Sequence, residues 1–326
     1  MRGSIKMCVL VMIGAAIIFY QSHLSNTLVV RIETNQELPN AKEEMFVDGN
    51  GIGVAAVGAG NSGAVGILNI NSNSHSQLAL PPLYIITPTY YRAEQLPELT
   101  RLSHTLMLVP NVHWLVIEDA HTKSPLVGEL LERTSLKFSH LVAPMPDKYK
   151  KRKVKPRGVS NRNRGLQWIR EHATNGVFYF ADDDNTYDLR LFEQMRFTKK
   201  VSMWPVGLIT KLGVSSPIVR NGTFDGFYDG WIAGRKFPVD MAGFAVSVKF
   251  LLERPNATMP FKPGFEEDGF LRSLAPFEPK DIELLASNCT KVLVWHTQTK
   301  KNERSQPLDM VKYGTTNLVD LKKVIF

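Results

Sequence analysis

The chain has 326 residues, of which 44% are hydrophobic and 21% are charged. This composition argues against a chain too polar to bury a core, and the length fits one large α/β domain with an N-terminal extension. The formal net charge is +8, and much of it is concentrated in one short segment.

The N-terminal segment predicts a membrane anchor. Arg2 and Lys6 precede an uninterrupted apolar run from Met7 to Tyr20. The run is shorter than the ~20 residues of a full span, but no small residues mark a cleavage site after it, which favours an uncleaved signal anchor over a secretory signal. Residues 1–6 are then a cytosolic tail and residues 7–24 the anchor helix, with the rest of the chain in the lumen.

Residues 25–80 are predicted to form a flexible stem. Glu33 to Asp48 is polar, and Gly49 to Ser76 is rich in Gly, Asn, Ser and Ala without helical or strand periodicity. Such a sequence buries too little apolar surface to offset the entropy lost on ordering it. We expect this stem to hold the folded domain, residues 81–326, away from the membrane.

The folded domain begins with alternating strands and helices. Leu83 to Thr87 is a short strand followed by a leucine-rich amphipathic helix, and Trp114 to Glu118 is a strand followed by a helix over Pro125 to Arg133. A helix over Val159 to His172 then leads into the apolar run Gly176 to Phe180. This βαβαβ order predicts a mostly parallel sheet with helices on both faces.

Three consecutive acids, Asp182, Asp183 and Asp184, follow the third strand. Adjacent carboxylates repel one another unless they share a cation, and magnesium or manganese carrying a diphosphate suits their oxygen ligands. The alternative is an acidic loop or helix start, because Asp is common at helix N-caps.

Other polar residues follow the first two strands. Thr89, Tyr90 and Asp119 lie at strand carboxyl ends, where open α/β sheets bind ligands, so we expect them to meet the three acids in one crevice. The chain has neither a dinucleotide-binding glycine motif nor a P-loop. Metal and arginine must therefore bind phosphate, which indicates nucleotide-sugar chemistry.

A strongly basic segment precedes the predicted helix at Val159. Its cations are Lys148, Lys150, Lys151, Arg152, Lys153, Lys155 and Arg157, with Arg162 and Arg164 just beyond. Nucleic-acid binding is one interpretation of such a run. A lumenal protein rarely meets nucleic acid, so an anionic nucleotide or an acidic glycan fits better, and a solvated loop is the plain alternative.

Three N-glycosylation sequons agree with a lumenal domain; they begin at Asn221, Asn256 and Asn288. Cys8 lies in the predicted anchor, and Cys289 is alone in the lumenal part, so no internal disulfide can form there. Cys289 is either a small buried hydrophobe or an intermolecular link.

Several longer motifs follow one another along the folded domain. They are Pro88-Thr-Tyr90, Glu118-Asp-Ala120, Pro156-Arg-Gly-Val159, Tyr179 to Tyr187, Trp204-Pro-Val-Gly207, Phe237 to Phe244 and Val294-Trp-His-Thr297. Together they closely resemble the β-1,3-glucuronyltransferases of glycosyltransferase family 43, over essentially all of residues 82–300. The order of tail, anchor, stem and lumenal domain also resembles that family.

The resemblance implies an A-type nucleotide-sugar transferase fold, Rossmann-like, with a donor-binding part over about 81–200 and an acceptor-binding part over about 201–326. It implies inverting transfer of glucuronic acid from UDP-glucuronate to the 3-hydroxyl of a terminal galactose, with Mn²⁺ as cofactor. The acceptor would be the proteoglycan linkage region or a lactosamine-type glycan. The resemblance also implies a homodimer in the Golgi membrane, single-pass and type II.

The resemblance assigns roles on the donor side. The residues that match family positions for the donor are Tyr90 and Asp119 at uracil, Arg157 and Arg162, Asp182 orienting an arginine, Asp183 at the ribose, Asp184 on the metal, and His296 at the diphosphate and bound sugar. Thr89 also matches a donor position, without a specific contact. Loss of Asp184 should therefore reduce turnover more than it affects folding.

Inversion needs one base for the acceptor hydroxyl and no protein nucleophile. The resemblance places this base at Glu267, with Glu266 and Asp268 as adjacent alternatives.

The acceptor-side positions that match the family are Trp231, Arg235 and Asp240. An exposed Trp offers its face to the C–H surface of a sugar, and the polar pair can bind hydroxyls, although burial in the core is the usual fate of Trp.

Two positions depart from the family pattern. Gln298 stands where the family has Arg after Trp-His-Thr, which removes a cation from the donor side, and Ser215 stands where many members have Glu. The alternatives are therefore transfer of a different UDP-sugar or a catalytically weakened lumenal sugar-binding protein. Retention of all three acids, Glu267, Arg157 and Arg162 argues against the weakened protein, because an inactive site has no reason to keep a costly cluster of like charges.

Overall fold

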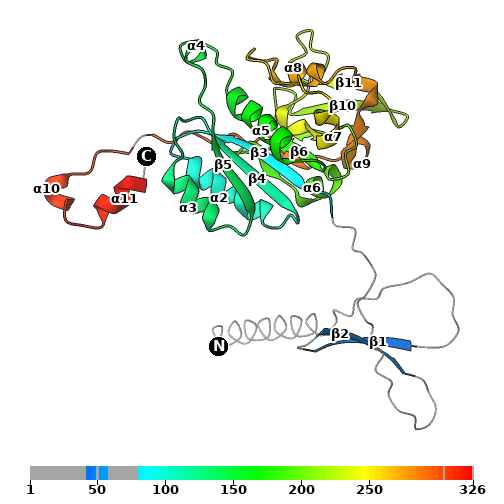
Figure 1. The fold of residues 1–326 in the computed structure, drawn as a ribbon, viewed down its shortest axis with the longest axis horizontal. Helices are drawn as coiled ribbons and strands as arrows, with labels where there is room; N and C mark the ends of the chain where they lie inside the picture. The colour runs from blue at the N-terminus through cyan, green and yellow to red at the C-terminus, as the bar shows by residue number, and fades with distance from the viewer. Residues whose placement is uncertain (1–41, 49–50, 58–79, 304, 325–326) are drawn as a thin grey trace, which may run out of the picture. The chain divides into compact units, whose positions relative to one another are not determined.

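The computed structural model describes residues 42–48, 51–57, 80–303 and 305–324, and the chain divides into two compact units, residues 1–74 and 75–326. In the first unit, β1 (Lys42–Asp48) and β2 (Gly51–Val57) pair antiparallel (Figure 1). They lie within the predicted stem, and the sequence analysis did not predict them.

The predicted anchor, residues 7–24, lies outside the described residues. Among the described residues, no helix has the length and apolar character needed to cross a membrane.

A seven-stranded sheet forms the centre of the second unit, in the order β13-β8-β12-β6-β3-β4-β5. β6, β3, β4 and β5 run parallel, β12 is antiparallel to both β6 and β8, and β13 is parallel to β8. The predicted, mostly parallel sheet is confirmed. Its strands are β3 (Leu83–Thr89), β4 (Val112–Glu118), β5 (Lys137–Val142), β6 (Val177–Phe180), β8 (Val201–Met203), β12 (Phe244–Ser247) and β13 (Glu283–Leu284).

Helices cover both faces of this sheet, as predicted, because successive side chains of a strand point to opposite faces. Leu83 and Ile85 of β3 pack in one apolar cluster with leucines of α2 (Gln95–Leu106) and α3 (Pro125–Glu132). Ile86, the next residue of β3, points to the opposite face and packs in a second cluster with α5 (Val159–His172). The structure gives α5 the bounds predicted from the sequence.

A second sheet of five short strands, β11-β10-β9-β14-β7, was not predicted. Its strands are β7 (Thr186–Tyr187), β9 (Val206–Gly207), β10 (Val214–Arg220), β11 (Thr223–Tyr228) and β14 (Val294–Trp295). β14 pairs antiparallel with β7, so the residues after β14 return to the residues before β7. This pairing brings His296 and Thr297 back toward the three acids.

The remaining elements are short and mostly lie in the C-terminal half. They are α4 (Asp147–Lys150), α6 (Leu189–Met195), α7 (Val248–Leu252), α8 (Glu266–Ser273), α9 (Leu285–Cys289), α10 (Met310–Tyr313), α11 (Leu318–Val324) and the 3₁₀ turns η1 (Met241–Gly243) and η2 (Pro279–Asp281).

Gly165 allows α5 to pack closely on β3. A Cβ atom at Gly165 would lie 2.6 Å from Cγ2 of Ile86, whereas a Cβ at Gly128 in α3 would lie 3.9 Å from its nearest neighbour, His140 Nδ1. Gly165→Ala should lower the free energy of unfolding by about 1–3 kcal/mol, because the extra methyl group overpacks the core. Gly128→Ala is the control and should leave stability unchanged or raise it by up to about 1 kcal/mol. Urea unfolding followed by tryptophan fluorescence measures both, and equal effects would contradict the packing argument.

Candidate active site

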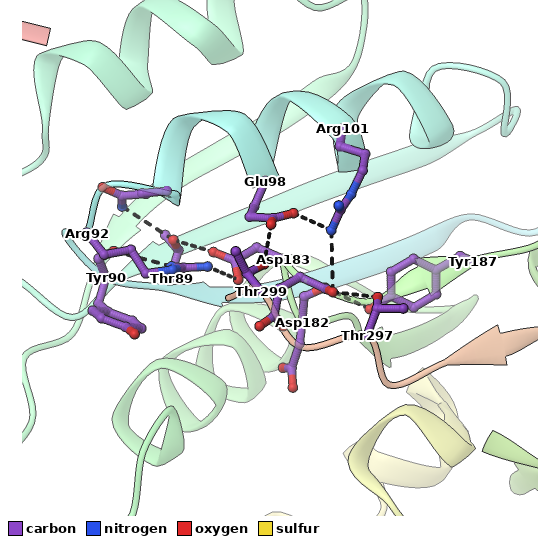
Figure 2. A network of polar contacts seen from close by, with 12 residues as sticks. Thr89, Tyr90, Arg92, Glu98, Arg101, Asp182, Asp183, Tyr187, Thr297 and Thr299 are labelled. Atoms are coloured by element: carbon purple, nitrogen blue, oxygen red, sulfur yellow. Dashed lines mark hydrogen bonds and ion pairs between the residues drawn. The ribbon is translucent and has the colours of Figure 1, made fainter. Parts of the chain in front are cut away.

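The three acids after β6 have three different sets of partners. Asp182 Oδ1 accepts a hydrogen bond from Arg162 Nη2. Asp183 is buried and accepts hydrogen bonds from Thr89 Oγ1 and Arg92 Nη2, each at 2.7 Å (Figure 2). Asp184 forms no ion pair with any residue that the structure describes. Two of the three carboxylates are thus neutralised by arginine, and the third, which accepts a hydrogen bond from the Thr299 backbone N–H, is left open to a cation.

Electrostatics distinguishes Asp184 further. Burial raises the pKa of Asp183, while Arg92 and Thr89 oppose that shift. Burial and then the charges of Asp182 and Asp183 raise the pKa of Asp184. Since an opposite charge favours the ionised form, a cation at Asp184 would relieve the repulsion that these neighbours create.

Arg162 reaches Asp182 because Gly158 leaves room for it. Gly158 is the N-cap residue just before α5 and has φ +72°, and a Cβ atom there would lie 2.3 Å from Arg162 Nη1. Only glycine meets both conditions, the left-handed backbone and the close approach of the guanidinium. Arg157, the other predicted donor-side arginine, lies just before this turn and is exposed.

The end of β3 meets the acids through Thr89, and the end of β4 lies beside it. Asp119 N donates to Thr89 O at 2.8 Å, and Asp119 Oδ1 accepts from Met145 N at 2.6 Å. Tyr90 is 43% exposed, and the guanidinium of Arg92 lies 4.7 Å from its ring centroid. Tyr90 therefore presents an accessible aromatic face beside Asp183.

Sequence reasoning missed Arg92. Its only local signal is its position two residues after Tyr90, since its partner Asp183 is 91 residues away in the sequence.

Residues 297–302, which we call the strap, cross the acids and attach to α2 (Figure 2). Thr297 Oγ1 donates to the backbone oxygen of Asp184 at 2.7 Å, and Thr299 Oγ1 donates to Glu98. Asn302 donates its backbone N–H and its side-chain Nδ2 to Glu94 Oε1, at 2.6 and 2.9 Å. The amphipathic pattern of the sequence marks only the leucines of α2 and gives no signal for these buried glutamates.

His296 lies between an acid and the residue that departs from the family pattern. Its Nδ1 is 3.5 Å from Asp240 Oδ2, close enough for an ion pair but not aligned for a hydrogen bond, and its Nε2 is 3.3 Å from Gln298 Nε2. Asp240 raises the pKa of His296. Gln298 therefore contacts the histidine, and Asp240 supports its protonated form.

Glu267 lies in the first turn of α8 and is half-buried. Burial, and then the charge of Asp240, raises its pKa to about 7, while Arg162 has a smaller opposing effect. Glu267 thus lies within electrostatic reach of both Asp240 and Arg162. A carboxylate with a pKa near neutrality suits a general base.

The two neighbours of Glu267 differ from it. Asp268 is buried and accepts hydrogen bonds from the backbone N–H groups of Lys236 and Phe237, at 2.7 and 2.9 Å, and from Arg272 Nε at 2.7 Å. These contacts give Asp268 a structural role. Glu266 is half-buried with its pKa raised by burial and is the remaining adjacent alternative.

The predicted acceptor-side residues form one loop. Trp231 is 55% exposed. Arg235 is turned inward: its guanidinium pairs with Asp229 Oδ1 at 2.9 Å, and its Nε donates to Trp231 O at 2.7 Å. Buried Asp229, which the sequence analysis missed, also accepts from Trp231 N at 2.7 Å and from Ser215 Oγ at 2.5 Å. Ser215 therefore helps to fix the loop that presents Trp231.

The glycosylation asparagines Asn221, Asn256 and Asn288 are all exposed, as sequon occupancy requires. Cys289 is partly buried, and burial raises the pKa of its thiol to about 12. The thiol therefore stays protonated and unreactive at neutral pH.

A cavity of about 870 Å³ lies elsewhere, lined in part by Leu80, Asn111, Gly176 and Arg196. These residues precede the parallel strands or lie beside their amino ends. Since ligands in open α/β sheets bind outside the carboxyl ends, this cavity is not the candidate site.

In the part of the chain that the structure describes, no group of three or more His, Cys, Asp or Glu side chains is arranged to hold a metal ion. A cation at Asp184 would therefore need ligands from a substrate, and diphosphate oxygens commonly supply them for Mg²⁺ and similar hard ions.

Comparisons with known proteins show which family the chain resembles. A family model described as Glycosyltransferase family 43 matches residues 102–300. The Drosophila melanogaster galactosylgalactosylxylosylprotein 3-beta-glucuronosyltransferase P is 66% identical over 246 residues, covering 75% of this chain and 51% of that protein. Its Drosophila counterpart S is 53% identical, covering 74% and 58%. The Homo sapiens galactosylgalactosylxylosylprotein 3-beta-glucuronosyltransferase 3 is 46% identical, covering 72% and 76%.

The chain spans about half the length of the Drosophila relatives that it matches. Among solved structures, Staphylococcus aureus TarS 1-349 in complex with UDP aligns at a TM-score of 0.42 with 14% identity, covering 67% of this chain and 61% of that one, a likeness too weak to support an argument. The family model and the three relatives are decisive: the chain belongs to glycosyltransferase family 43.

Proposed function

We propose that this chain transfers glucuronic acid from UDP-glucuronate to the 3-hydroxyl of a terminal galactose, with inversion. The names of the relatives support this activity, and a galactosyl-galactosyl-xylosyl acceptor on a protein is the first choice among galactose-terminated glycans. The observation that carries the proposal is the position of Glu267, which lies within electrostatic reach of both Arg162 and Asp240. Its pKa of about 7 suits a general base.

The reaction would be one displacement. The acceptor hydroxyl oxygen forms a bond to C1 of glucuronate, its proton passes to Glu267, and the bond from C1 to the UDP oxygen breaks. Attack from the face opposite UDP inverts C1 without a protein nucleophile.

The donor would lie across the carboxyl ends of β3, β4 and β6. We assign the uracil to Tyr90 and Asp119, the ribose to Thr89 and Asp183, and the diphosphate to Arg157 and His296. His296 suits this role because Asp240 favours its protonated, cationic form.

Asp184 would hold the manganese ion together with the diphosphate. The site fits this ion because Asp184 is the acid without an arginine partner among the described residues. When bound, the ion supplies positive charge that stabilises the departing UDP. Arg162 keeps Asp182 neutralised, so that the open charge is confined to Asp184.

On the acceptor side, Trp231 would stack on the galactose, with Arg235 and Asp240 at its hydroxyl groups. In the structure, Arg235 is committed to Asp229 and Trp231, so its part in placing the hydroxyl groups is to fix the loop that presents Trp231. Gln298, which replaces a cation beside His296, favours a second candidate, transfer of a different UDP-sugar.

We further propose that the protein is a single-pass type II protein of the Golgi membrane, anchored by residues 7–24 and glycosylated at its sequons. The homodimer expected for the family is part of the same proposal. The basic flank before the anchor and the exposed asparagines support this arrangement.

The direct test is release of UDP from UDP-glucuronate by the full chain, with Mn²⁺ and either a galactosyl-galactosyl or an N-acetyllactosamine acceptor. We expect turnover on one of them, its loss on chelation and its return with Mn²⁺. Glu267→Gln should lower kcat by roughly 10²–10⁴-fold without lowering stability, because it removes the base and not the fold. UDP-glucose and UDP-N-acetylglucosamine serve as control donors. Turnover with a control donor alone would replace the proposed function with the second candidate.

The rate should also depend on pH in a defined direction. Glu267 accepts a proton only when ionised, so kcat/KM should rise with pH through about 7 and level off above it. The residual activity of Glu267→Gln should lack this inflection. A wild-type profile that is flat between about pH 5 and 8.5 would contradict the assignment of Glu267 as the base.

A further inference from the structure

The segment between β5 and α5 carries most of the net charge of the chain. Residues 148–157, which we call the basic segment, contain seven cations, and the adjacent Asp147 is the one carboxylate beside them. The balance is six positive charges in a chain whose net charge is +8. All seven cations are exposed.

These cations have almost no partners within the described residues. Lys150 pairs with Asp147 at 2.9 Å, and no other cation of the segment forms an ion pair there. Lys148 and Arg152 both lie near the ring of Tyr149, at 5.1 and 4.8 Å from its centroid. An exposed cluster of like charges without counter-charges creates a strong positive potential, which attracts an anionic partner.

The basic segment is not free in solution, because Tyr149 ties it to the body. Its ring stacks parallel on Phe261, with centroids 4.8 Å apart and planes at 1°. Phe261 belongs to the loop 259–265, which leads into α8 and Glu267. Figure 1 shows α4, within this region, at the tip of a loop that extends beside α5.

The loop 259–265 is itself well fixed. Asn163 of α5 bonds both backbone groups of Met259, with Nδ2 donating to the oxygen at 2.9 Å and Oδ1 accepting from the N–H at 2.8 Å. Pro260 packs so closely on α8 that a Cβ at Gly269 would lie 2.3 Å from its Cγ. The basic segment is thus held next to the helix that carries Glu267.

The same loop contacts the acceptor side at its other end. A Cβ at Gly264 would lie 3.5 Å from Nε1 of the exposed Trp231. One short loop therefore has the predicted sugar platform, Trp231, at one end and the basic segment at the other. This arrangement suits an acceptor with a neutral sugar end and an anionic part farther along.

We propose that the basic segment, apart from Arg157, which is assigned to the diphosphate, binds acidic residues of the polypeptide that carries the acceptor glycan. The proposal rests on the proposed function. Galactose and xylose carry no charge, so in an acceptor of the kind that the relatives' names describe, the anionic groups come from the protein part. The terminal galactose would lie at Trp231 and Glu267 while the acidic polypeptide lies along the cations.

The test compares two glycopeptides bearing the same galactosyl-galactosyl-xylosyl group, one with Glu residues flanking the glycosylated serine and one with Gln in their place. We expect the full chain to prefer the Glu peptide in kcat/KM by roughly fivefold at low ionic strength, and high salt to remove the preference. The triple variant Lys151→Ser, Lys153→Ser, Lys155→Ser should abolish the preference while leaving KM for UDP-glucuronate unchanged.

A matched control variant removes the same amount of charge elsewhere, from three exposed lysines near the amino ends of the strands: Lys199→Ser, Lys200→Ser, Lys249→Ser. This control should keep the preference for the Glu peptide. Equal use of both peptides by the wild type, or an unchanged preference in the first triple variant, would overturn the proposal. A rise in KM for UDP-glucuronate with both peptides would instead assign the segment to the donor.

Fluorescence anisotropy of the two labelled glycopeptides separates this inference from the proposed function, because it needs no turnover. Tighter binding of the Glu peptide, lost in the first triple variant, supports the surface even if no glucuronate is transferred. Equal binding of both peptides refutes it even if transfer occurs.

Discussion

The repulsion among three consecutive carboxylates at the end of β6 is the constraint that orders this site. At an effective dielectric constant of 20, two like charges 4 Å apart repel by about 4 kcal/mol, more than an exposed ion pair returns. The chain meets this cost with long-range contacts: Arg92 neutralises Asp183, to which Thr89 at the end of β3 also donates a hydrogen bond, and Arg162 neutralises Asp182 from α5. What remains is one open carboxylate, Asp184, where a cation with its diphosphate would complete the balance.

The rest of the site follows from the elements that this arrangement brings together. Pairing of β14 with β7 returns the chain to the acids, so that His296 lies near Asp240 and the strap attaches to α2 through Glu94 and Glu98. On the other side, Asp268 fixes α8 through two backbone N–H groups and leaves Glu267 to titrate near neutrality. Structural and reactive carboxylates thus differ by their partners, even when they are adjacent in the sequence.

The sequence predicts the parts of the fold that have local periodicity. Apolar runs and the amphipathic pattern identified β3, β4, β6 and α5, because burial on a sheet or helix face repeats every two or about 3.6 residues. β5 was missed because most of its side chains are only half-buried, and β7, β9 and β14 are two-residue strands without a pattern. The polar residues of the site that directly follow strands were predicted because open α/β sheets bind ligands at the carboxyl ends of their strands. The roles of Glu267 and Trp231 came from the family resemblance. Arg92 and Asp229 escaped because their partners come from tertiary contacts.

Electron paramagnetic resonance of Mn²⁺ bound to the full chain with UDP tests the division of roles among the three acids most directly. Asp184→Asn and Asp182→Asn make the same chemical change two residues apart. Asp184→Asn should weaken Mn²⁺ binding by at least about tenfold, because even the loss of a residue that only supports a metal ligand has an effect of that size. Asp182→Asn should largely retain Mn²⁺ binding. Equal loss in both variants, or no UDP-dependent Mn²⁺ binding by the wild type, would contradict the assignment of Asp184 as the open carboxylate for the cation.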